Sequence, residues 1–515
     1  MSETLHGLLE ASARKFPERI AVEDPDAGKE IRYDELDARS SDIARILSLA
    51  SVKQGDRVGI YVPKSIGSLT AIFGALKAGA GYVPVDPDAP PQRNAFVFQD
   101  CNAAAIIVER SRIANLQEHY GGNELREIAR LDQLDRYGLE LTVLQPQGQR
   151  PGDVAPPDGL SYILYTSGST GNPKGVIHTH ASALAFVRWC AEAYPPTHED
   201  KFSSHAPFHF DLSILDIYVP IMAGGTVVLL SESLGKTPRA LAQVISISRV
   251  TVWYSTPSIL RLLLEHGGIG DHDYSALRIV YFAGEVFPVK HLRALTQRWP
   301  HPRYVNLYGP TETNVCTYYE VELPVPEDRA EAYPIGRVCS DDVAKVMDDD
   351  GVEAKKGEPG ELFVTGGSVM QGYWNLPERN ERAFWIDSNG LKWHRTGDVV
   401  IESDDGVYLY HGRRDRMVKR RGYRVELGEI ESALYRHESI TEAAVIAAPD
   451  EQNGVSIRAF HNWNGETPPS LIGLKQFCSK NLPMYMIPDK FTALESLPKT
   501  STDKIDYQRL KGMAQ

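Results

Sequence analysis

The sequence predicts an α/β protein with a large N-terminal domain and a small C-terminal α+β domain. Its 515 residues exceed what one hydrophobic core usually supports, so at least two domains are expected. Over most of the chain, short apolar segments alternate with longer amphipathic ones, a pattern typical of parallel strands joined by crossover helices. The composition changes at a basic run bracketed by glycines, residues 412–422. We therefore assign residues 1–413 to a large domain of several subdomains and residues 414–515 to the small domain.

Individual elements follow from the same patterns. The short apolar runs predict strands at 58–62, 81–85, 104–108, 226–230 and 278–282. Amphipathic periodicity predicts helices at 66–78, 239–246 and 259–266. In the small domain we expect a helix at 428–437, a strand at 442–448, a helix at 471–481 and a proline-rich turn at 482–488.

Composition and charge exclude several classes of function. The chain is 42% hydrophobic and 24% charged, as is usual for globular proteins. A net charge of −13 argues against a nucleic-acid partner, which would require a basic surface. The sequence has no signal-peptide pattern and no apolar run of about 18 residues, so we expect no membrane partner. The five cysteines are scattered and never form a C-x-x-C pair, which favours reduced thiols in the cytoplasm.

Residues 165–176 carry the densest cluster of functional groups. The cluster contains the hydroxyl residues Thr166, Ser167, Ser169 and Thr170, the glycines Gly168, Gly171 and Gly175, and Lys174. Glycines let backbone N–H groups turn inward, and hydroxyls and a cation strengthen such an anion site. The apolar segment 160–165 predicts a strand that leads into the loop, and 175–177 predicts a short return strand. These flanks favour a phosphate-binding loop over a flexible surface loop.

Four further clusters occur in a characteristic order. They are Asn306-Leu-Tyr-Gly-Pro-Thr-Glu-Thr313, His394-Arg-Thr-Gly-Asp398, Gly412-Arg-Arg-Asp415 and the segment 497–506, which contains Lys504. Each cluster alone is often only a turn or a solvated charge run. With the loop, and with 76–86, 360–362 and 482–488, they resemble the adenylate-forming superfamily over nearly the whole chain. The resemblance is to the amino-acid adenylation domains of nonribosomal peptide assembly lines.

The resemblance implies two half-reactions. ATP and an amino acid first give an aminoacyl-adenylate and pyrophosphate, with Mg²⁺ as the metal. A phosphopantetheine thiol on a carrier protein then captures the aminoacyl group. No carrier segment and no condensation signature is recognised, so we expect a free-standing enzyme that loads a separate carrier protein.

Residue roles also follow from the resemblance. The loop would hold the phosphates, Glu312 would bind Mg²⁺, and Lys504 would bridge the substrate carboxylate and the α-phosphate. Catalytic roles are implied for Lys504, Thr166, Lys174 and the hinge residue Asp415. The nucleotide site would comprise Thr166, Ser167, Gly168, Ser169, Thr170, Gly171, Lys174, Gly284, Glu285, Asn306, Tyr308, Gly309, Thr311, Glu312, Asp398, Arg413 and Lys504. Among these, Tyr308 and Asn306 would contact adenine, and Asp398 and Arg413 would contact ribose.

A second conformation is implied for the small domain. After adenylation this mobile domain would rotate at Asp415, withdraw Lys504 and present residues 420–424 to the thiol. Asp503 stands where glycine is typical of the family, next to the catalytic lysine. We hypothesise that the basic run, including Arg420 and Arg421, attracts an acidic carrier protein.

Asp211 indicates the class of acid that is activated. It matches the carboxylate that pairs with the α-ammonium of an amino acid in this family, and a buried carboxylate needs such a partner. The implied substrate pocket comprises Phe210, Asp211, Leu212, Leu215, Tyr254, Tyr281, Ala283, Leu307, Gly309, Val315 and Cys316. This wall is apolar and similar to that of L-proline:carrier-protein ligases, so L-proline is predicted. Tyr281 stands at a usually aliphatic position, which leaves L-alanine and glycine open.

The sequence argues against three other kinds of protein or site. An acyl-CoA ligase would share the fold, but Asp211 argues against it. A non-catalytic nucleotide-binding protein is disfavoured by the joint presence of Lys504, Glu312 and Asp398. The spacing of His205, His209 and Asp211 could suggest zinc, but Pro207 would interrupt a helical pairing of the histidines.

Overall fold

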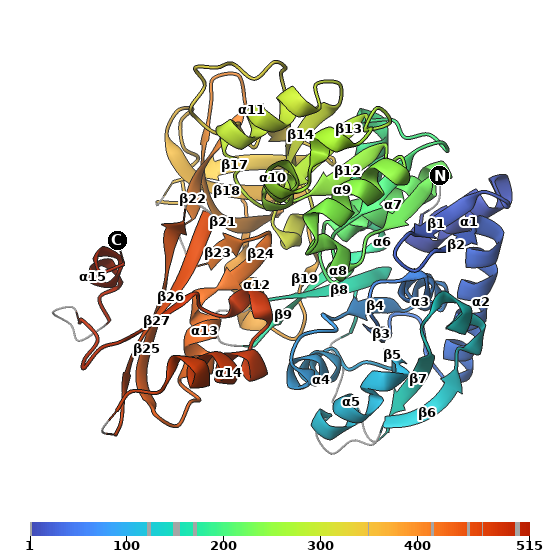
Figure 1. The fold of residues 1–515 in the computed structure, drawn as a ribbon, viewed down its shortest axis with the longest axis horizontal. Helices are drawn as coiled ribbons and strands as arrows, with labels where there is room; N and C mark the ends of the chain where they lie inside the picture. The colour runs from blue at the N-terminus through green and yellow to red at the C-terminus, as the bar shows by residue number, and fades with distance from the viewer. Residues whose placement is uncertain are drawn as a thin grey trace.

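The computed structural model describes residues 3–120, 125–147, 155–167, 172–348, 350–413, 417–450, 454–465, 467–499 and 505–514. Figure 1 shows two large sheets with helices between and around them, and the C-terminal elements gathered on one side of the molecule. This is the predicted α/β fold with a large N-terminal and a small C-terminal domain. The predicted boundary at 413/414 lies beside residues 414–416, outside the described part, and stays a prediction.

The first large sheet has nine strands and a parallel centre. Strands β1, β11, β10, β12, β13 and β14 pair in parallel, and β2, β15 and β16 join antiparallel at the two edges. The strands, in spatial order, are β16 (Arg337–Val338), β15 (Thr317–Val321), β14 (Arg303–Tyr308), β13 (Ile279–Ala283), β12 (Val252–Ser255), β10 (Lys201–Ser204), β11 (Thr226–Leu229), β1 (Ile20–Asp24) and β2 (Lys29–Arg32). The predicted strands at 226–230 and 278–282 are thereby confirmed.

The second large sheet has eight strands. Its centre, β8, β4, β3 and β5, is parallel, while β6, β7, β9 and β19 add antiparallel edges. In spatial order the strands are β19 (Gly372–Tyr373), β9 (Lys174–Thr179), β8 (Leu160–Thr166), β4 (Gly81–Pro84), β3 (Arg57–Tyr61), β5 (Ala105–Glu109), β7 (Leu141–Pro146) and β6 (Leu125–Arg130). The sheet contains all the strands predicted before residue 180.

Helices bury the apolar faces of both sheets. The first group packs in a common core with strands of both sheets: α1 (Leu5–Lys15), α2 (Tyr33–Leu49), α3 (Ile66–Lys77), α6 (His180–Ala193) and α7 (Ser213–Ala223). The other face of the nine-stranded sheet is covered by α8 (Glu232–Gly235), α9 (Pro238–Ile247), α10 (Pro257–His266) and α11 (Val289–Arg298). The other face of the eight-stranded sheet is covered by α4 (Pro91–Asp100) and α5 (Ile113–His119). The helices predicted at 66–78, 239–246 and 259–266 correspond to α3, α9 and α10.

A third, five-stranded sheet follows in the chain. It consists of β17 (Asp342–Met347), β18 (Pro359–Gly366), β20 (Phe384–Ile386), β21 (Lys392–Glu402) and β22 (Tyr408–Arg413), and α12 (Pro377–Ala383) precedes β20. All its pairings are antiparallel. No strand was predicted in this region.

The small domain combines a hairpin, a sheet and helices. Its elements are β23 (Met417–Arg420), β24 (Tyr423–Glu426), α13 (Leu427–Leu434), β25 (Ile440–Asp450), β26 (Gly454–Trp463), α14 (Leu471–Asn481), β27 (Lys490–Ala493) and α15 (Tyr507–Gly512). The helix at 471–481 was predicted with its observed bounds, and α13 is shorter than expected. Strands β26 and β27 and the β23–β24 hairpin were not predicted. In Figure 1, α15 lies at the edge of the molecule, far from the N-terminal elements.

The described residues contain no helix with the length and apolarity that crossing a membrane requires.

Candidate active site

The functional side chains gather where parallel strands end. Thr166 is the last residue of β8, Ala283 ends β13 and Tyr308 ends β14. The short 3₁₀ helix Thr311–Thr313 follows β14, and Asp211 lies just before α7. Ligands of α/β proteins bind in the crevice outside the carboxyl ends of such strands. The topology therefore brings together segments that are separated by more than a hundred residues.

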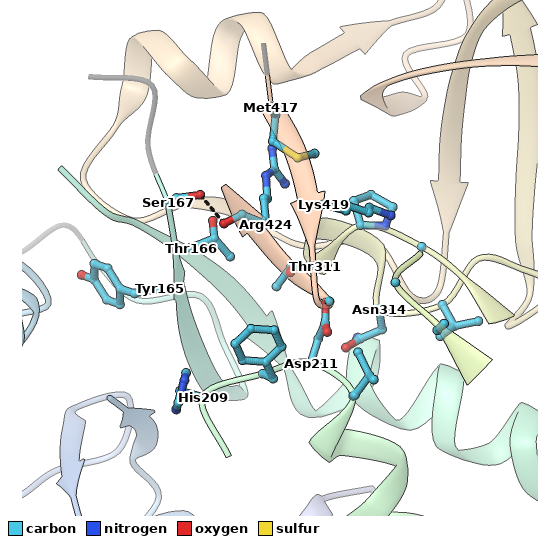
Figure 2. Close-up of a pocket in the computed structure, with 18 of the residues that line it drawn as sticks. Tyr165, Thr166, Ser167, His209, Asp211, Thr311, Asn314, Met417, Lys419 and Arg424 are labelled. Carbon is cyan, nitrogen blue, oxygen red and sulfur yellow. Dashed lines mark hydrogen bonds between the residues drawn. The ribbon is translucent and has the colours of Figure 1, made fainter. Parts of the chain in front are cut away.

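A cavity occupies this crevice, and the β23–β24 hairpin forms one wall of it. Figure 2 shows Tyr165, Thr166 and Ser167 on the left, Met417, Lys419 and Arg424 of the hairpin at the upper centre, and Asp211 and Asn314 below the hairpin. The lining residues are Tyr165, Thr166, Ser167, His209, Phe210, Asp211, Leu212, Tyr254, Ala283, Gly284, Gly309, Pro310, Thr311, Asn314, Val315, Met417, Lys419, Gly422, Arg424 and Tyr485. Eleven positions expected from the sequence are among them: Thr166, Ser167, Phe210, Asp211, Leu212, Tyr254, Ala283, Gly284, Gly309, Thr311 and Val315.

Glu312, the residue expected to bind Mg²⁺, is buried and accepts hydrogen bonds from three side chains. Its side chain is 1% exposed. Lys174 Nζ donates to Oε1 at 2.9 Å, and the Tyr373 hydroxyl donates to the same oxygen at 2.6 Å. Arg424 Nη1 donates to both oxygens, at 2.9 and 2.8 Å. Burial alone would raise the pKa of Glu312, but Arg424 and Lys174 hold it well below its usual value.

Lys174 is itself buried by this arrangement. Besides Glu312, its Nζ contacts the Tyr373 hydroxyl at 3.0 Å and lies 4.4 Å from the centre of that ring. Burial and the nearby Arg424 lower the pKa of Lys174 to about 7, although Glu312 opposes the shift. The sequence did not indicate Tyr373, and it placed Arg424 only in the segment 420–424 that is expected to face the thiol.

The phosphate loop is described only at its two ends. Gly168, Ser169, Thr170 and Gly171 lie outside the described residues, so their predicted roles stay predictions. The Thr166 hydroxyl is buried and has no hydrogen-bond partner in the part of the chain that the structure describes. Ser167 Oγ donates to the Arg424 carbonyl at 2.8 Å, which joins the loop to the hairpin (Figure 2). A buried, unpartnered hydroxyl is suited to a ligand oxygen.

The expected ribose site forms a second network, behind the cavity wall. Asp398 is fully buried, accepts from the Tyr308 hydroxyl at 2.5 Å and pairs with Arg413 at 2.8 Å. Lys419 Nζ lies 5.3 Å from the centre of the Tyr308 ring. Burial lowers the pKa of Lys419, whereas Asp398 and Asp211 counteract the shift. The hairpin thus brings a buried cation close to both expected carboxylates.

Two other expected nucleotide residues have protein partners. Asn306 Nδ2 donates to the Pro334 carbonyl at 2.8 Å. Glu285 accepts from Ser258 on α10 and, at 2.7 Å, from the backbone N–H of Gly422 in the hairpin. Glu285 therefore lies at the contact between the two domains and does not line the cavity.

Asp211 lies in the cavity, as the sequence predicted. Burial raises the pKa of its carboxyl, and a hydrogen bond from Thr311 and the charge of Lys419 oppose the shift. The nearby wall is apolar, with Leu212, Ala283 and Val315.

Four residues of the expected pocket lie behind this wall. Leu215, Tyr281, Leu307 and Cys316 are buried in the protein core and do not line the cavity. The Tyr281 ring meets Tyr254 edge-on, with 6.1 Å between ring centres, and also meets Tyr194. Tyr254 faces the cavity in front of Tyr281.

The basic run 412–422 is exposed only in part, which differs from the expectation that both Arg420 and Arg421 face a carrier protein. Arg420 is 6% exposed, bonds the carbonyls of Tyr485 and Ile487, and pairs with Asp489. It holds the hairpin to the small domain, so it is not available to attract a carrier protein. Arg421 is exposed, as expected. The run reads as solvated charge because its partners are remote in the sequence.

Asp415, Asp503 and Lys504 lie outside the described residues. Lys499 and Ile505, which flank 500–504, form a β-bridge, and Lys499 pairs with Glu442 on β25 at 2.7 Å. Neither flanking residue lines the cavity.

The two histidines considered for zinc, His205 and His209, pack separately against different aromatic rings. His205 packs against Trp253, and burial lowers its pKa to about 3. His209 packs edge-on against Phe210 at the cavity wall. Across the described residues, no three His, Cys, Asp or Glu side chains are grouped to hold a metal.

Comparison with known proteins decides the family. Residues 9–374 match the model of the AMP-binding enzymes, and residues 429–504 match the model of the AMP-binding enzyme C-terminal domain. The chain is an AMP-binding enzyme. The resemblance to adenylate-forming enzymes is thereby confirmed, and the protein is a ligase of the AMP-forming type.

Relatives of similar length lie within the same family. One is the L-proline--[L-prolyl-carrier protein] ligase of Pseudomonas fluorescens, 38% identical over 506 residues, which covers 98% of this chain and 97% of the relative. Another, from Streptomyces coelicolor and of the same name, is 38% identical over 93% of this chain and 91% of the relative.

Solved structures support the fold of this AMP-binding enzyme. IdnL1 aligns with a TM-score of 0.80 and 29% identity over 97% of this chain and 99% of that one. The adenylation domain AlmE of Vibrio cholerae, solved with glycyl-adenosine-5'-phosphate, aligns with a TM-score of 0.82 over 100% of this chain and 98% of that one. At 23% identity, the second likeness supports the fold alone.

Proposed function

We propose that this enzyme activates L-proline as prolyl-AMP and transfers the prolyl group to the phosphopantetheine thiol of a separate carrier protein. The observation that carries the proposal is the position of Asp211, in one cavity with Thr166 and Ser167 at the start of the phosphate loop. An ammonium site beside a phosphate site is what an amino acid and ATP require together. The 38% identity to two L-proline--[L-prolyl-carrier protein] ligases supports proline.

In the first half-reaction, an oxygen of the substrate carboxylate attacks the α-phosphorus of ATP, and pyrophosphate leaves. Asp211 would bind the α-amino group and aim the carboxylate at the nucleotide. Thr166, whose buried hydroxyl lacks a partner among the described residues, would donate to a phosphate oxygen, with Lys174 near by. Donors arranged in advance where charge develops give the largest single contribution in such transfers. Lys504 would bridge the two reacting anions.

Mg²⁺ suits the chemistry of the Glu312 carboxylate, because Mg²⁺ prefers carboxylate and phosphate oxygens. In the arrangement described here, however, Arg424, Lys174 and Tyr373 already bind that carboxylate. We therefore assign the metal to Glu312 only for the arrangement in which Arg424 has withdrawn. Bound there, the metal would neutralise phosphate charge.

In the second half-reaction, the thiol gives its proton to solvent, and the thiolate sulfur attacks the prolyl carbonyl carbon. The bond from that carbon to the phosphate oxygen breaks, and AMP leaves with the oxygen. The hairpin residues Lys419, Gly422 and Arg424 line the cavity in the present arrangement, which is the one expected for this step. Lys419, close to Asp398 and Asp211, would donate to the departing phosphate oxygen. The carrier protein would supply the phosphopantetheine arm, and an acidic carrier surface would suit the exposed Arg421.

The apolar wall sets the size of the side chain. Leu212, Ala283 and Val315 present no charge to the substrate, and Tyr254 closes the cavity in front of Tyr281. This wall suits the pyrrolidine ring of proline. L-Alanine and glycine remain the alternatives, because a pocket discriminates one methylene by only about 10–200-fold.

Mass spectrometry tests the proposal. The enzyme, ATP, Mg²⁺ and L-proline should yield prolyl-AMP, and a phosphopantetheinylated carrier protein added next should gain one prolyl group. Absence of prolyl-AMP would contradict the first half-reaction. Prolyl transfer to free coenzyme A but to no carrier protein would favour an acyl-CoA ligase instead.

A further inference from the structure

Arg424 reaches across the domain boundary to two parts of the expected pyrophosphate site. Its guanidinium Nη1 lies 2.9 and 2.8 Å from the two oxygens of Glu312. Its backbone carbonyl accepts from Ser167 Oγ at 2.8 Å. Glu312 is 1% exposed and Arg424 17% exposed, so water screens this pair weakly. Arg424 thus binds both the Glu312 carboxylate and the Ser167 hydroxyl.

The same groups are the ones a metal–pyrophosphate complex needs. A divalent cation at Glu312 would meet the guanidinium at short range, and two like charges in a buried site repel strongly. The hydroxyl of Ser167 cannot donate to the Arg424 carbonyl and to a phosphate oxygen at once, because it carries one hydrogen. Docking of the hairpin and binding of the metal complex therefore compete for the same space and charge.

We propose that Arg424 replaces the divalent metal at Glu312 when the hairpin docks, so that the two occupy the site in turn. The guanidinium keeps the buried carboxylate paired after metal and pyrophosphate have left. Release of the metal complex thereby permits docking, which orders the two half-reactions. The inference rests on the proposed function for the meaning of that order, but the competition itself concerns only this chain and a metal.

A second contact across the domain boundary allows docking of the hairpin to be weakened without changing Arg424 or Glu312. Arg93 on α4 forms an ion pair with Glu429 on α13, and Glu429 is 1% exposed. This pair does not involve Glu312. Removing the Arg93–Glu429 pair should weaken docking of the hairpin without altering the metal site. Because docking and metal binding compete, weaker docking should strengthen metal binding.

Titration with Mn²⁺ alone, followed by the EPR signal of the free ion, tests the competition. We expect Arg424→Met to bind Mn²⁺ at least about 5-fold more tightly than the natural chain, the lower end of typical coupling between competing sites. Arg424→Lys retains the cation and should bind as the natural chain does. Arg93→Met should also bind more tightly, and Arg337→Met, which breaks an exposed pair with Asp405, should change nothing. Thermal unfolding identifies any variant that fails to fold.

Unchanged or weaker Mn²⁺ binding in folded Arg424→Met would overturn the proposal. Adding Glu312→Gln to Arg424→Met should abolish the gain, and a gain that persists would place the metal elsewhere and also overturn it. These results do not depend on the amino acid activated. Failure of adenylation with proline would leave the Mn²⁺ result standing, so the two proposals can fail separately.

Discussion

Asp211, which is half-buried, and Glu312, which is buried, are two carboxylates of one site whose pKa values shift in opposite directions. Burial raises the pKa of Asp211, and a hydrogen bond from Thr311 and the charge of Lys419 only partly compensate. Arg424 and Lys174 more than compensate burial at Glu312 and lower its pKa. The difference lies in the number of cations at each residue. Asp211 is the carboxylate that an additional cation, the α-ammonium of a substrate, would stabilise.

Replacing Asp211 tests this assignment. Asp211→Asn should lower kcat/KM for the amino acid by roughly 30- to 5,000-fold, the equivalent of about 2–5 kcal/mol for losing one partner of a buried charge pair. The KM for ATP should change little, because Asp211 does not reach the nucleotide. Steady-state adenylation kinetics measure both constants. Asp405→Asn, at an exposed carboxylate, is the control, and an equal loss for both substrates would contradict the assignment.

The β23–β24 hairpin is the element that links the two domains at the site. Gly422 lies at its turn with φ +81, and a Cβ on that residue would overlap Cγ2 of Thr256. Its N–H bonds Glu285, and Lys419 and Arg424 point into the cavity from the two strands. The positive φ and the close approach to the Thr256 side chain therefore both favour glycine.

Gly422→Ala should block docking of the hairpin. We expect thioester transfer to fall by at least tenfold, about 1.4 kcal/mol, while adenylation is largely retained. Single-turnover transfer from preformed adenylate measures the second step separately. Adding Thr256→Ser removes the overlapping methyl group but not the strain of alanine at this positive φ, so it should restore transfer in part. Equal loss of both steps, or no rescue by the double variant, would contradict the role of the hairpin.

Helix α1 is held by a histidine that must stay neutral. The Leu5 N–H donates to Nδ1 of His180 at 3.2 Å, and burial lowers the pKa of His180 to about 4. The unfolded chain takes up this proton near pH 6.5, so the stability that neutral His180 contributes is lost as the pH falls from about 6.5 to 4.

His180→Gln should therefore flatten the fall in stability across this pH range. Urea unfolding at several pH values measures the slope, and His266→Gln, at an exposed histidine, is the control. An unchanged slope in His180→Gln would show that other groups cause the acid sensitivity.

At the scale of single helices and strands, local sequence patterns predicted some elements and missed others for physical reasons. Strand β3 and helix α3 are buried along almost their whole length, and the apolar residues that this burial requires make both elements recognisable. In the hairpin, Lys419 and Arg424 appear solvated from sequence alone, because their partners Asp398 and Glu312 are remote in the chain. Thr166, Ser167 and Asp211 carry their own local motifs and do line one cavity, whereas the Arg424–Glu312 pair could not be foreseen from local sequence.

In the whole molecule, the two domains have separate cores. Residues of the first large core come from both large sheets, while the small domain has its own cluster around Ile430, Val445 and Cys478. Three polar contacts join the domains, Arg424–Glu312, Arg93–Glu429 and Gly422–Glu285, and the ring of Phe210 meets that of Tyr423 edge-on. Polar interfaces permit relative domain motion more readily than large apolar ones.

Thiol labelling in urea tests whether the domains unfold separately. All five cysteines are buried, so the folded chain should react slowly. We expect Cys478, in the smaller core, to react at lower urea than Cys101, Cys190, Cys316 and Cys339. Cys478→Ala should remove only the early reaction. One transition for all five thiols would contradict separate domain unfolding.

The central claim is that this enzyme adenylates a small apolar amino acid, with L-proline as the substrate. Amino-acid-dependent ATP–pyrophosphate exchange across proline, alanine, glycine and serine tests it most directly. The account predicts the highest kcat/KM for L-proline. Exchange with alanine or glycine but not proline would contradict the choice of substrate, and exchange with no amino acid would contradict adenylation itself.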